Sequence, residues 1–228
     1  KNLPSNPFLN SYISVSEEDL KEFKINSFSN ELNGTKLIKS TIGISNNIVK
    51  VKTSKNGIIF FGSLFYEPNI TAVNWLIDEI MPKVWDTNPN IKLLVAGREP
   101  SKKLLKKISK SKKITLIPNP SDMNILIKSS KISVAPMLTG SGQQFKIIDS
   151  LINGIPVVTT SKGSIPLGLK DGKHLLVADS SKLFAQSIIR LFNDESLADN
   201  LALNGRNHAI YNFTWKNITK KLVDDLFS

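Results

Sequence analysis

A glycine-bracketed loop followed by a helix holds the residue types that best fit ligand chemistry. The loop, residues 140–142, reads glycine-serine-glycine, and the helix expected from about Gln143 carries Lys146 and Asp149. Bare backbone N–H groups at a helix start form a site for an anion, and a nearby ammonium group adds a point charge for a phosphate. A carboxylate three residues further lies on roughly the same face and could accept two ribose hydroxyls. The pattern therefore favours a helix end that binds both a diphosphate and a sugar.

The same residues also allow an interpretation without a ligand. The glycine-serine-glycine stretch can be a flexible turn, and Lys146 and Asp149 can be an ordinary surface pair. The loop is not the Rossmann dinucleotide fingerprint, and no glycine-lysine-serine/threonine ending makes it a Walker A loop. The loop by itself leaves both interpretations open.

Apolar runs that alternate with helical patterns must position this loop. Strands are expected at 58–62, 91–97, 114–118, 132–136, 155–160 and 174–178, and helices at 69–85, 101–109 and 121–130. Continuous apolar strands that alternate with helices predict a parallel sheet covered on both faces. The right-handed crossover rule then predicts a doubly wound α/β fold with a mainly parallel sheet. After residue 179 the pattern is wholly helical, which predicts a helical C-terminal tail.

Three further loops are candidates, because ligands of open α/β sheets bind beyond the carboxyl ends of the strands. They contain Gly62-Ser63, Gly97-Arg98 and Asn119-Pro120. Glycines let the backbone approach a ligand closely, and Arg98 adds a cation. The alternatives are a rim ion pair of Arg98 with Glu99 or Glu67, and a plain β-turn at 118–122.

Residues 1–57 follow a different pattern. A short strand and a capped helix are expected at 12–25, a further strand and turn at 35–45, and a polar connector at 46–57. This segment is too short for a domain. We therefore divide the chain into the remnant of a preceding domain plus a connector at 1–57 and an α/β domain at 58–228.

Composition restricts the classes of function. The chain has 228 residues and no cysteine, which excludes disulfides and thiolate chemistry and is compatible with a reducing cytosol. No apolar run approaches the roughly 20 residues needed to cross a bilayer. The chain begins at Lys1 rather than a methionine, so we expect a fragment or a processed protein.

The net charge of +11 allows nucleic acid, anionic lipid or a phosphorylated small molecule as partners. Nucleic acid is disfavoured because no helix-turn-helix, zinc or RNA-recognition signature is present. The lysine-rich stretch 101–113 could contact an anionic membrane or be a solvated helix face. We expect a cytoplasmic protein, with peripheral membrane contact as an open alternative.

An ordered series of motifs resembles a known family. The motifs are "FFGSLFYEPN", "NPNIKLLVAGREP", "ITLIPNPSD" and "TGSGQQFKIIDSLINGIPVVTTSKG". From about 58 to 215, closing with "FTWKNI", the chain resembles the C-terminal, donor-nucleotide-binding domain of GT-B glycosyltransferases of the group-1 or glycogen-synthase-like family. "YISVSEED" resembles the end of that family's N-terminal acceptor domain. The resemblance implies a Rossmann-like half of a GT-B fold at 58–228. It also implies sugar transfer from a nucleotide diphospho-sugar to an acceptor, with retention and no essential cofactor or metal, in glycan or polysaccharide biosynthesis.

The resemblance also implies roles for individual residues. The catalytic residues, which would stabilise the departing diphosphate, are Lys146 and Arg98. The donor-binding residues would be Gly62, Ser63, Asn119, Pro120, Gly140, Ser141, Gly142, Gln143, Gln144 and Asp149. Asp149 matches the second acid of the family's E-x7-E element, which holds the donor ribose, whereas Ser141 stands where the first glutamate would be. The family's frequent arginine and lysine pair after the first strand is missing, and Arg98 could supply that charge.

Several assignments stay open. The donor could be a UDP-, GDP- or ADP-sugar, and the sugar, the acceptor and the oligomeric state are not specified. The alternative function is a non-catalytic nucleotide-sugar-binding module. Because the family's acceptor binds to the N-terminal domain, most of which is absent from these residues, we expect the chain alone to be inactive. His174 and His208 are expected to be surface or packing residues.

Overall fold

The computed structural model describes residues 11–14, 36–39, 43, 56–140 and 144–227. Two compact units are present, one formed by residues 1–46 with 210–228 and the other by residues 47–209. Part of the predicted site and of the N-terminal segment lies outside the described residues, namely Ser141, Gly142, Gln143, the capped helix expected within 12–25 and most of the connector expected at 46–57.

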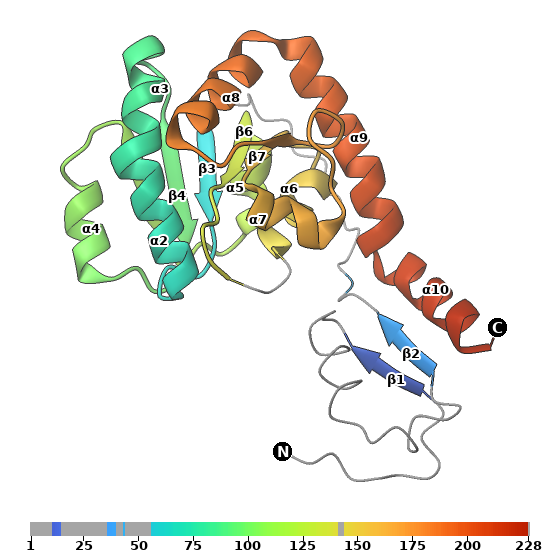
Figure 1. Ribbon diagram of the computed structural model, residues 1–228. Helices are drawn as coiled ribbons and strands as arrows, with labels where there is room; N and C mark the ends of the chain where they lie inside the picture. Colours follow the sequence, from blue (N-terminus) through green and yellow to red (C-terminus); the bar gives the residue numbers. More distant parts are fainter. Residues whose placement is uncertain (1–10, 15–35, 40–42, 44–55, 141–143, 228) are drawn as a thin grey trace. The chain divides into compact units, whose positions relative to one another are not determined.

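The larger unit contains a six-stranded parallel sheet. Its strands are β3 (Ile58–Phe61), β4 (Leu93–Gly97), β5 (Ile114–Pro118), β6 (Ile132–Ala135), β7 (Val157–Thr159) and β8 (Leu176–Val177). The spatial order is β5-β4-β3-β6-β7-β8, and every neighbouring pair is parallel (Figure 1). This confirms the predicted doubly wound α/β class. The direction of chain progression reverses between β3 and β6.

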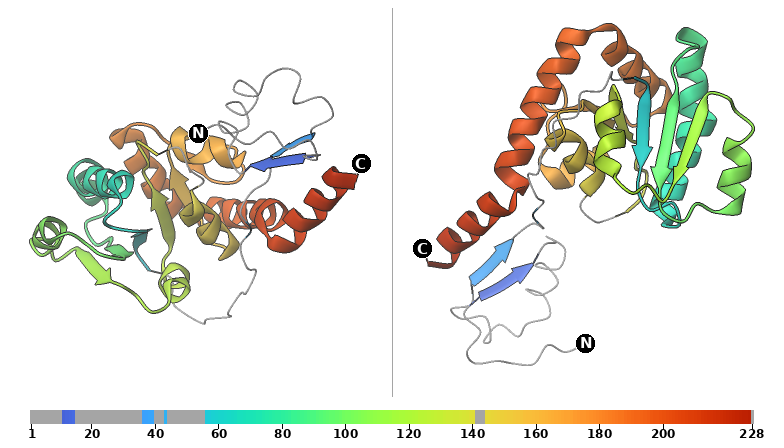
Figure 2. Two further views of the ribbon diagram at one scale, coloured as in Figure 1. Left: turned by 90° about the horizontal axis from the view of Figure 1, so that it is seen from below. Right: turned by 180° about the vertical axis from the view of Figure 1, so that it is seen from behind.

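Helices cover both faces of this sheet (Figure 2). They are α2 (Glu67–Trp75), α3 (Met81–Thr87), α4 (Lys102–Ile108), α5 (Met123–Ser129), α6 (Phe145–Ile152), α7 (Ser161–Ser164), α8 (Ser181–Asn193) and α9 (Glu195–Phe213), the last of which also enters the smaller unit. On one face α2 and α8 meet through the rings of Trp75 and Phe184, whose centroids are 5.9 Å apart in an edge-to-face arrangement. On the other face Ile127 of α5 packs against Ile59 and Phe61 of β3.

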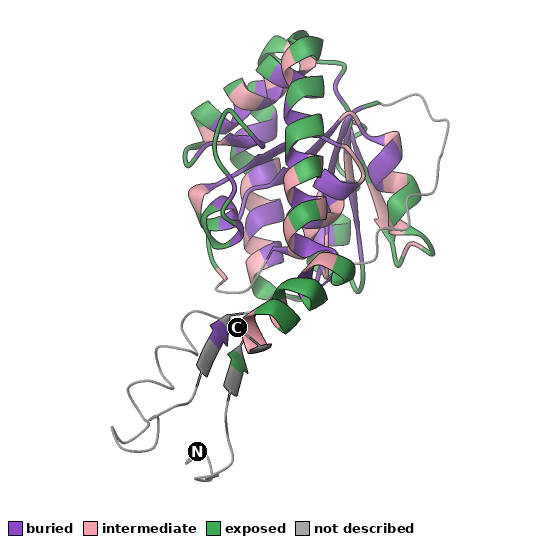
Figure 3. Ribbon diagram, turned by 90° about the vertical axis from the view of Figure 1, so that its right-hand side faces the viewer, coloured by how far each residue is buried: buried purple, intermediate pink, exposed green. Residues whose placement is uncertain are grey.

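The central strands are buried along their whole length. All four residues of β3 and of β6 are buried, and Figure 3 shows the interior of the larger unit mainly in purple. Alternate residues of a strand point to opposite faces, so a strand covered on both sides buries every position and is mostly apolar. Ser133 of β6 is the polar exception, and its hydroxyl is hydrogen-bonded to that of Ser150 on α6 at 2.7 Å. Burial on both faces is why largely apolar runs identified these strands in the sequence.

The first long helix differs from its predicted form. The helix expected at 69–85 runs from Glu67 to Thr87 and contains a π-helical segment, Leu76–Ile80, between α2 and α3. The backbone N–H of Met81 bonds to the carbonyl of Leu76, five residues earlier. Proline lacks an N–H and its ring clashes with the carbonyl four residues before it, and the wider π turn lets the helix continue through Pro82.

After β7 the chain forms two short turns of helix, α7 and a 3-10 turn (Ile165–Leu167), which the polar sequence there did not predict. Further on, His174 is buried, and its Nδ1 accepts a hydrogen bond from the backbone N–H of Lys170 at 3.1 Å. Its ring lies 4.4 Å from the ring of His208 on α9. Both histidines therefore serve packing, one of the two roles expected.

The smaller unit pairs β1 (Ser11–Ser14) in parallel with β2 (Lys36–Lys39). Helix α10 (Trp215–Phe227) contacts β2, and the indole of Trp215 lies directly against Gly43, which leaves no room for a side chain there. The C-terminal part of the chain is helical, as predicted.

Candidate functional site

The candidate site lies where the order of the strands reverses. In open α/β sheets, ligands bind outside the carboxyl ends of the strands at this switch point. Here it is formed by the loops that follow β3 and β6, which contain Gly62 and Gly140. Helix α6 begins just after the second of these loops. The topology therefore places the predicted glycine loop and the predicted Gly62 loop at one edge.

Lys146, the second residue of α6, is held at this edge in surroundings that are largely apolar. Its Nζ donates a hydrogen bond to Oδ1 of Asn69, lies 3.3 Å from the Sδ of Met137, and sits 5.2 Å from the centre of the Phe60 ring. Burial lowers the pKa of Lys146 from 10.5 to about 8, because few of these neighbours replace the water that solvates a free ammonium group.

Asn69 links Lys146 to the loop after β3. Its Nδ2 donates to the carbonyl oxygen of Ser63 at 2.9 Å. Gly62 has φ +152°, a conformation that favours glycine, and a Cβ added there would lie 2.9 Å from that Nδ2 and 3.5 Å from the Nζ of Lys146. Gly62 and Lys146, predicted separately from the sequence, are therefore neighbours.

Gly140 marks the other side of the site. Its φ of +104° favours glycine, and its neighbours are Pro68 and the side-chain nitrogen of Gln144. Gln144 is buried and directly precedes α6. Because residues 141–143 lie outside the described residues, Gly140 alone represents the predicted cradle of backbone amides at 140–142, and the role of the cradle stays a prediction.

Asp149 follows Lys146 by three residues on α6 and is half-buried. Burial raises the pKa of its carboxyl from 3.8 to about 6. One helix thus carries an acid and a base whose pKa values are both displaced toward the neutral forms. Such displaced values are typical of functional sites.

The loops after β4 and β5 join the same edge through the backbone. The backbone N–H of Leu64 donates to the carbonyl of Arg98 at 2.8 Å, and that of Asn119 donates to the carbonyl of Gly97, also at 2.8 Å. Both Glu99 and Asn119 adopt positive φ angles, of 54° and 49°, and the Glu99 N–H donates to the side-chain oxygen of Asn119 at 3.2 Å.

The side chains in these loops are open to solvent. Arg98 and Asn119 are exposed and Pro120 is half-exposed. In the part of the chain that the structure describes, Arg98 forms no ion pair, so the rim pair with Glu99 or Glu67 is not observed. The structure brings Lys146, Gly62 and Ser63 together around Asn69, and places Gly140 beside Pro68 and Gln144. The main-chain hydrogen bond from Leu64 to Arg98 joins the Arg98 loop to the loop that contains Gly62 and Ser63.

Asn69 is the residue that the sequence interpretation missed. A signal for it was present, because Asn69, Ala72, Val73 and Leu76 follow the i, i+3, i+4, i+7 spacing of one helix face. All four are buried. A polar residue in phase with an apolar face must find partners inside the protein, and that rule would have marked it.

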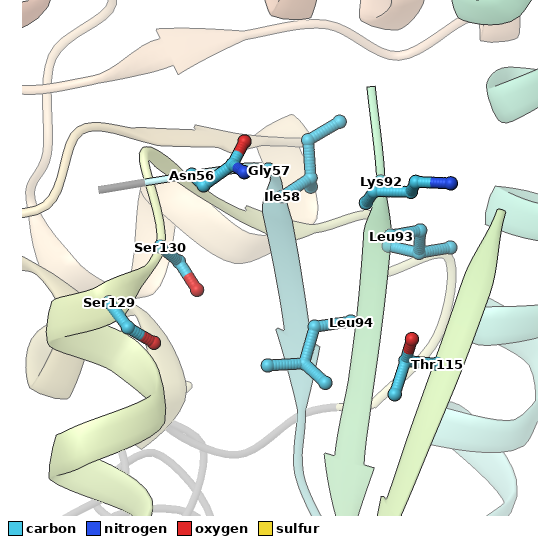
Figure 4. A pocket seen from close by; sticks show the side chains of 9 residues that line it. All are labelled: Asn56, Gly57, Ile58, Lys92, Leu93, Leu94, Thr115, Ser129 and Ser130. Carbon is cyan, nitrogen blue, oxygen red and sulfur yellow. The ribbon is translucent and has the colours of Figure 1, made fainter. Parts of the chain in front are cut away.

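A surface hollow at the opposite edge of the sheet does not fit the predicted ligand. It has a volume of about 180 Å³ and is lined by nine residues near the starts of β3 and β4 (Figure 4). The hydroxyls of Ser129 and Ser130 both already donate to the carbonyl of Leu126. Its lining is mainly apolar, with Lys92 as the charged member.

The described residues lack two features, a cluster of metal-ligating side chains and a membrane-spanning helix. Among the described residues, no group of three or more histidine, cysteine, aspartate and glutamate side chains could hold a metal ion. Within the same residues, no helix has the length and apolar character needed to pass through a bilayer.

Comparisons with known proteins identify the family of this chain and similar folds. The sequence model described as Glycosyl transferases group 1 matches residues 55–194. A Klebsiella pneumoniae protein, described as an uncharacterized 44.6 kDa protein in cps region, is 33% identical over 177 residues, which are 75% of this chain and 45% of that protein. The chain therefore spans less than half the length of this relative.

Solved structures show the same fold. TarM of S. aureus, in a structure that contains UDP, has a TM-score of 0.74 at 19% sequence identity. The match covers 96% of this chain and 44% of the TarM chain. HepE of Anabaena, in complex with UDP and glucose, has a TM-score of 0.73 at 16% sequence identity. The match covers 98% of this chain and 64% of the HepE chain. From the family match over residues 55–194, this chain belongs to the group 1 glycosyl transferases, with the fold of the C-terminal, Rossmann-like domain of a GT-B enzyme.

Proposed function

We propose that this chain binds the nucleoside diphosphate sugar of a glycosyltransferase at the edge formed by the loops after β3 and β6. The observation that carries the proposal is the ammonium of Lys146. It lies at the switch point between Gly62 and the loop that begins at Gly140, and no carboxylate of the described residues pairs with it. A diphosphate bound there would supply the missing negative charge.

The binding roles follow from the positions of the residues. Lys146 and the amides of residues 140–142 would hold the diphosphate, and the carboxylate of Asp149 would accept the ribose hydroxyls. The loop with Asn119 and Pro120 would contact the base. UDP is the first donor nucleotide to test, because TarM and HepE were both solved with UDP; GDP and ADP are the alternatives.

The proposed chemistry depends on stabilising a leaving group. When the bond between the sugar and the diphosphate breaks, negative charge develops on the diphosphate. A fixed ammonium group and oriented N–H groups in a site with little water stabilise such charge strongly, and Arg98 would add a second cation. The acceptor oxygen would form the new bond to the sugar, and its proton would pass to an oxygen of the departing diphosphate. In a transfer with retention the stabilisation of this leaving group therefore matters more than a protein base.

The remaining parts of the enzyme are also proposals. The acceptor would bind to a preceding domain, of which residues 1–57 would be the last segment and the connector. The activity would serve glycan or polysaccharide biosynthesis in the cytoplasm. The exposed lysines of residues 101–113 would allow peripheral contact with an anionic membrane.

Calorimetric titration with UDP, GDP, ADP and their sugars tests the proposal. We expect Lys146→Met to weaken binding of the preferred nucleotide by roughly 1–3 kcal/mol, as for a lost hydrogen bond to a charged group. The matched control is Lys131→Met, because Lys131 is also half-buried but lies away from the site. Its Nζ donates to the carbonyl of Phe192 at 3.1 Å and lies 5.1 Å from the centre of the Phe192 ring. Wild-type affinity in the Lys146 variant would remove this lysine from the site.

A non-catalytic nucleotide-sugar-binding module is the second candidate. It is favoured by Ser141, which stands where the family's first glutamate would be. A turnover assay on a chain that includes the preceding domain separates the two. Sugar transfer to an acceptor supports the glycosyltransferase. A chain that binds the donor, but neither transfers the sugar nor hydrolyses the donor, supports the non-catalytic module.

A further inference from the structure

The side-chain amide of Asn69 connects two parts of the candidate site that lie far apart in the sequence. Its Nδ2 donates to the carbonyl of Ser63 at 2.9 Å, and its Oδ1 accepts from the Nζ of Lys146, 77 residues away. The side chain is only 6% exposed and lies in the first turn of α2. Because a carbonyl oxygen can only accept, the bond to Ser63 determines that the amide oxygen faces the ammonium group.

We propose that Asn69 is a positioning residue that holds the Lys146 ammonium where the donor diphosphate binds. The inference rests on the proposed function of this site. An ammonium group has three N–H donors. Within the described residues, Asn69 accepts one of them and the sulfur of Met137, at 3.3 Å, faces a second as a weak acceptor. The diphosphate would accept the third.

No similar side chain can replace this amide. An aspartate has no N–H to donate to the Ser63 carbonyl, and a leucine of similar size can neither donate nor accept. A longer side chain has little room, because even a Cβ added at Gly62 would lie 2.9 Å from the Asn69 Nδ2. Aspartate therefore removes the N–H donor and keeps an oxygen acceptor, whereas leucine removes both.

The variants Asn69→Asp and Asn69→Leu test the proposal in the 228-residue chain. Asn74 provides the matched control, since it lies on the same helix and its Oδ1 also accepts from a lysine, the Nζ of Lys107, at 2.8 Å. The probe is whichever of UDP, GDP and ADP the wild-type chain binds most tightly. We expect both Asn69 variants to bind it about 5- to 50-fold more weakly, and Asn74→Asp and Asn74→Leu to bind it as wild type does.

A second readout separates positioning from a general loss of stability. NMR titration of the Cε and Nζ signals of Lys146 measures its pKa without any nucleotide. In the wild-type chain burial is the cause of the lowered pKa. Asn69→Asp should raise the midpoint above the wild-type value, because a carboxylate favours the charged lysine, and Asn69→Leu should lower it further. A purely structural role would lower the melting temperature in both variants and leave the midpoint in place.

Each outcome decides a different statement. A wild-type chain that binds none of the three nucleotides would overturn the proposed function and, with it, the role assigned to Asn69. A wild-type chain that binds one of them, while the Asn69 variants keep its affinity and the Lys146 midpoint, would overturn the positioning role alone. Weaker binding together with midpoints that move in opposite directions would support both.

Discussion

The affinity of this chain for a nucleoside diphosphate should fall as the pH rises above about 8. The group responsible is the ammonium of Lys146, whose pKa burial lowers from 10.5 to about 8. One pKa unit corresponds to about 1.4 kcal/mol, so keeping this lysine charged in the free protein costs roughly 3 kcal/mol. A bound diphosphate removes that cost by placing negative charge beside the ammonium group.

The size of the effect follows from proton linkage. With a pKa of about 8, nearly all Lys146 side chains are charged at pH 7 and about one in ten is charged at pH 9. If the bound form stays charged, affinity falls about tenfold between these pH values. Binding should then take up about 0.1 proton at pH 7 and about 0.9 proton at pH 9. Calorimetry in buffers of different ionisation enthalpy measures both quantities.

The stability of the free chain should change in the opposite direction. The unfolded chain binds more protons at Lys146 than the folded chain between pH 8 and 10.5. The contribution of this group to the free energy of unfolding therefore rises with pH across that range. Urea unfolding at several pH values, compared between the wild type and Lys146→Met, isolates this contribution.

The variants decide whether Lys146 is responsible. Lys146→Met should bind more weakly at pH 7 and lose the additional fall toward pH 9, while Lys131→Met should keep the wild-type profile. A wild-type affinity that stays constant from pH 7 to 9, or a fall that persists in Lys146→Met, would refute the reasoning. The lysine would then be compensated by another group or lie outside the ligand site.

Two further predictions concern the same edge of the sheet. Because burial raises the pKa of Asp149 to about 6, affinity for UDP-glucose should fall below pH 6, where the carboxyl becomes protonated and no longer accepts two hydroxyls. Asp149→Asn should bind this nucleotide sugar roughly 1.5–3 kcal/mol more weakly at pH 7 in calorimetry and show no such fall; an unchanged acid limb would implicate another group. A Cβ at Gly97 would overlap the carbonyl oxygen of Gly62 and lie 2.9 Å from Leu64. Gly97→Ala should therefore lower the free energy of unfolding by roughly 2–3 kcal/mol in urea titration, and a wild-type midpoint would show that the two loops can separate freely.

The sheet could be predicted from the sequence because each strand is defined by a local signal. The apolar run at 58–62 became β3 at Ile58–Phe61, and the run at 132–136 became β6 at Ile132–Ala135. Both runs are largely apolar, with Ser133 as the buried polar exception, because helices cover both faces, and the crossover rule then placed their carboxyl ends at one edge. The loops after these strands could thus be identified as a ligand edge without any knowledge of contacts.

The environment of Lys146 could not be predicted in the same way. In the sequence it is one lysine near the start of an amphipathic helix, a position where solvated side chains are common. Its burial depends on Asn69, 77 residues earlier, and on the Phe60 ring beneath it. Local patterns contain no information on such contacts. Pro82 marks a local break in the helical pattern, but the form of that break could not be predicted, because helix propensity does not distinguish four-residue from five-residue hydrogen bonding.

The arrangement of charges at α6 fits the proposed ligand, which carries both a diphosphate and hydroxyl groups. Lys146 and Asp149 are three residues apart, yet burial is the cause of both pKa displacements, and the two groups form no ion pair among the described residues. An ion pair between them would have stabilised the free chain and occupied both groups. Left apart, neither charge has a partner of opposite charge among the described residues, and an added ligand would stabilise both, with an anion for the lysine and hydrogen-bond donors for the aspartate. Stability given up in the free protein at such a site is recovered as binding free energy, and a ligand that meets only one of the two groups recovers only part of it.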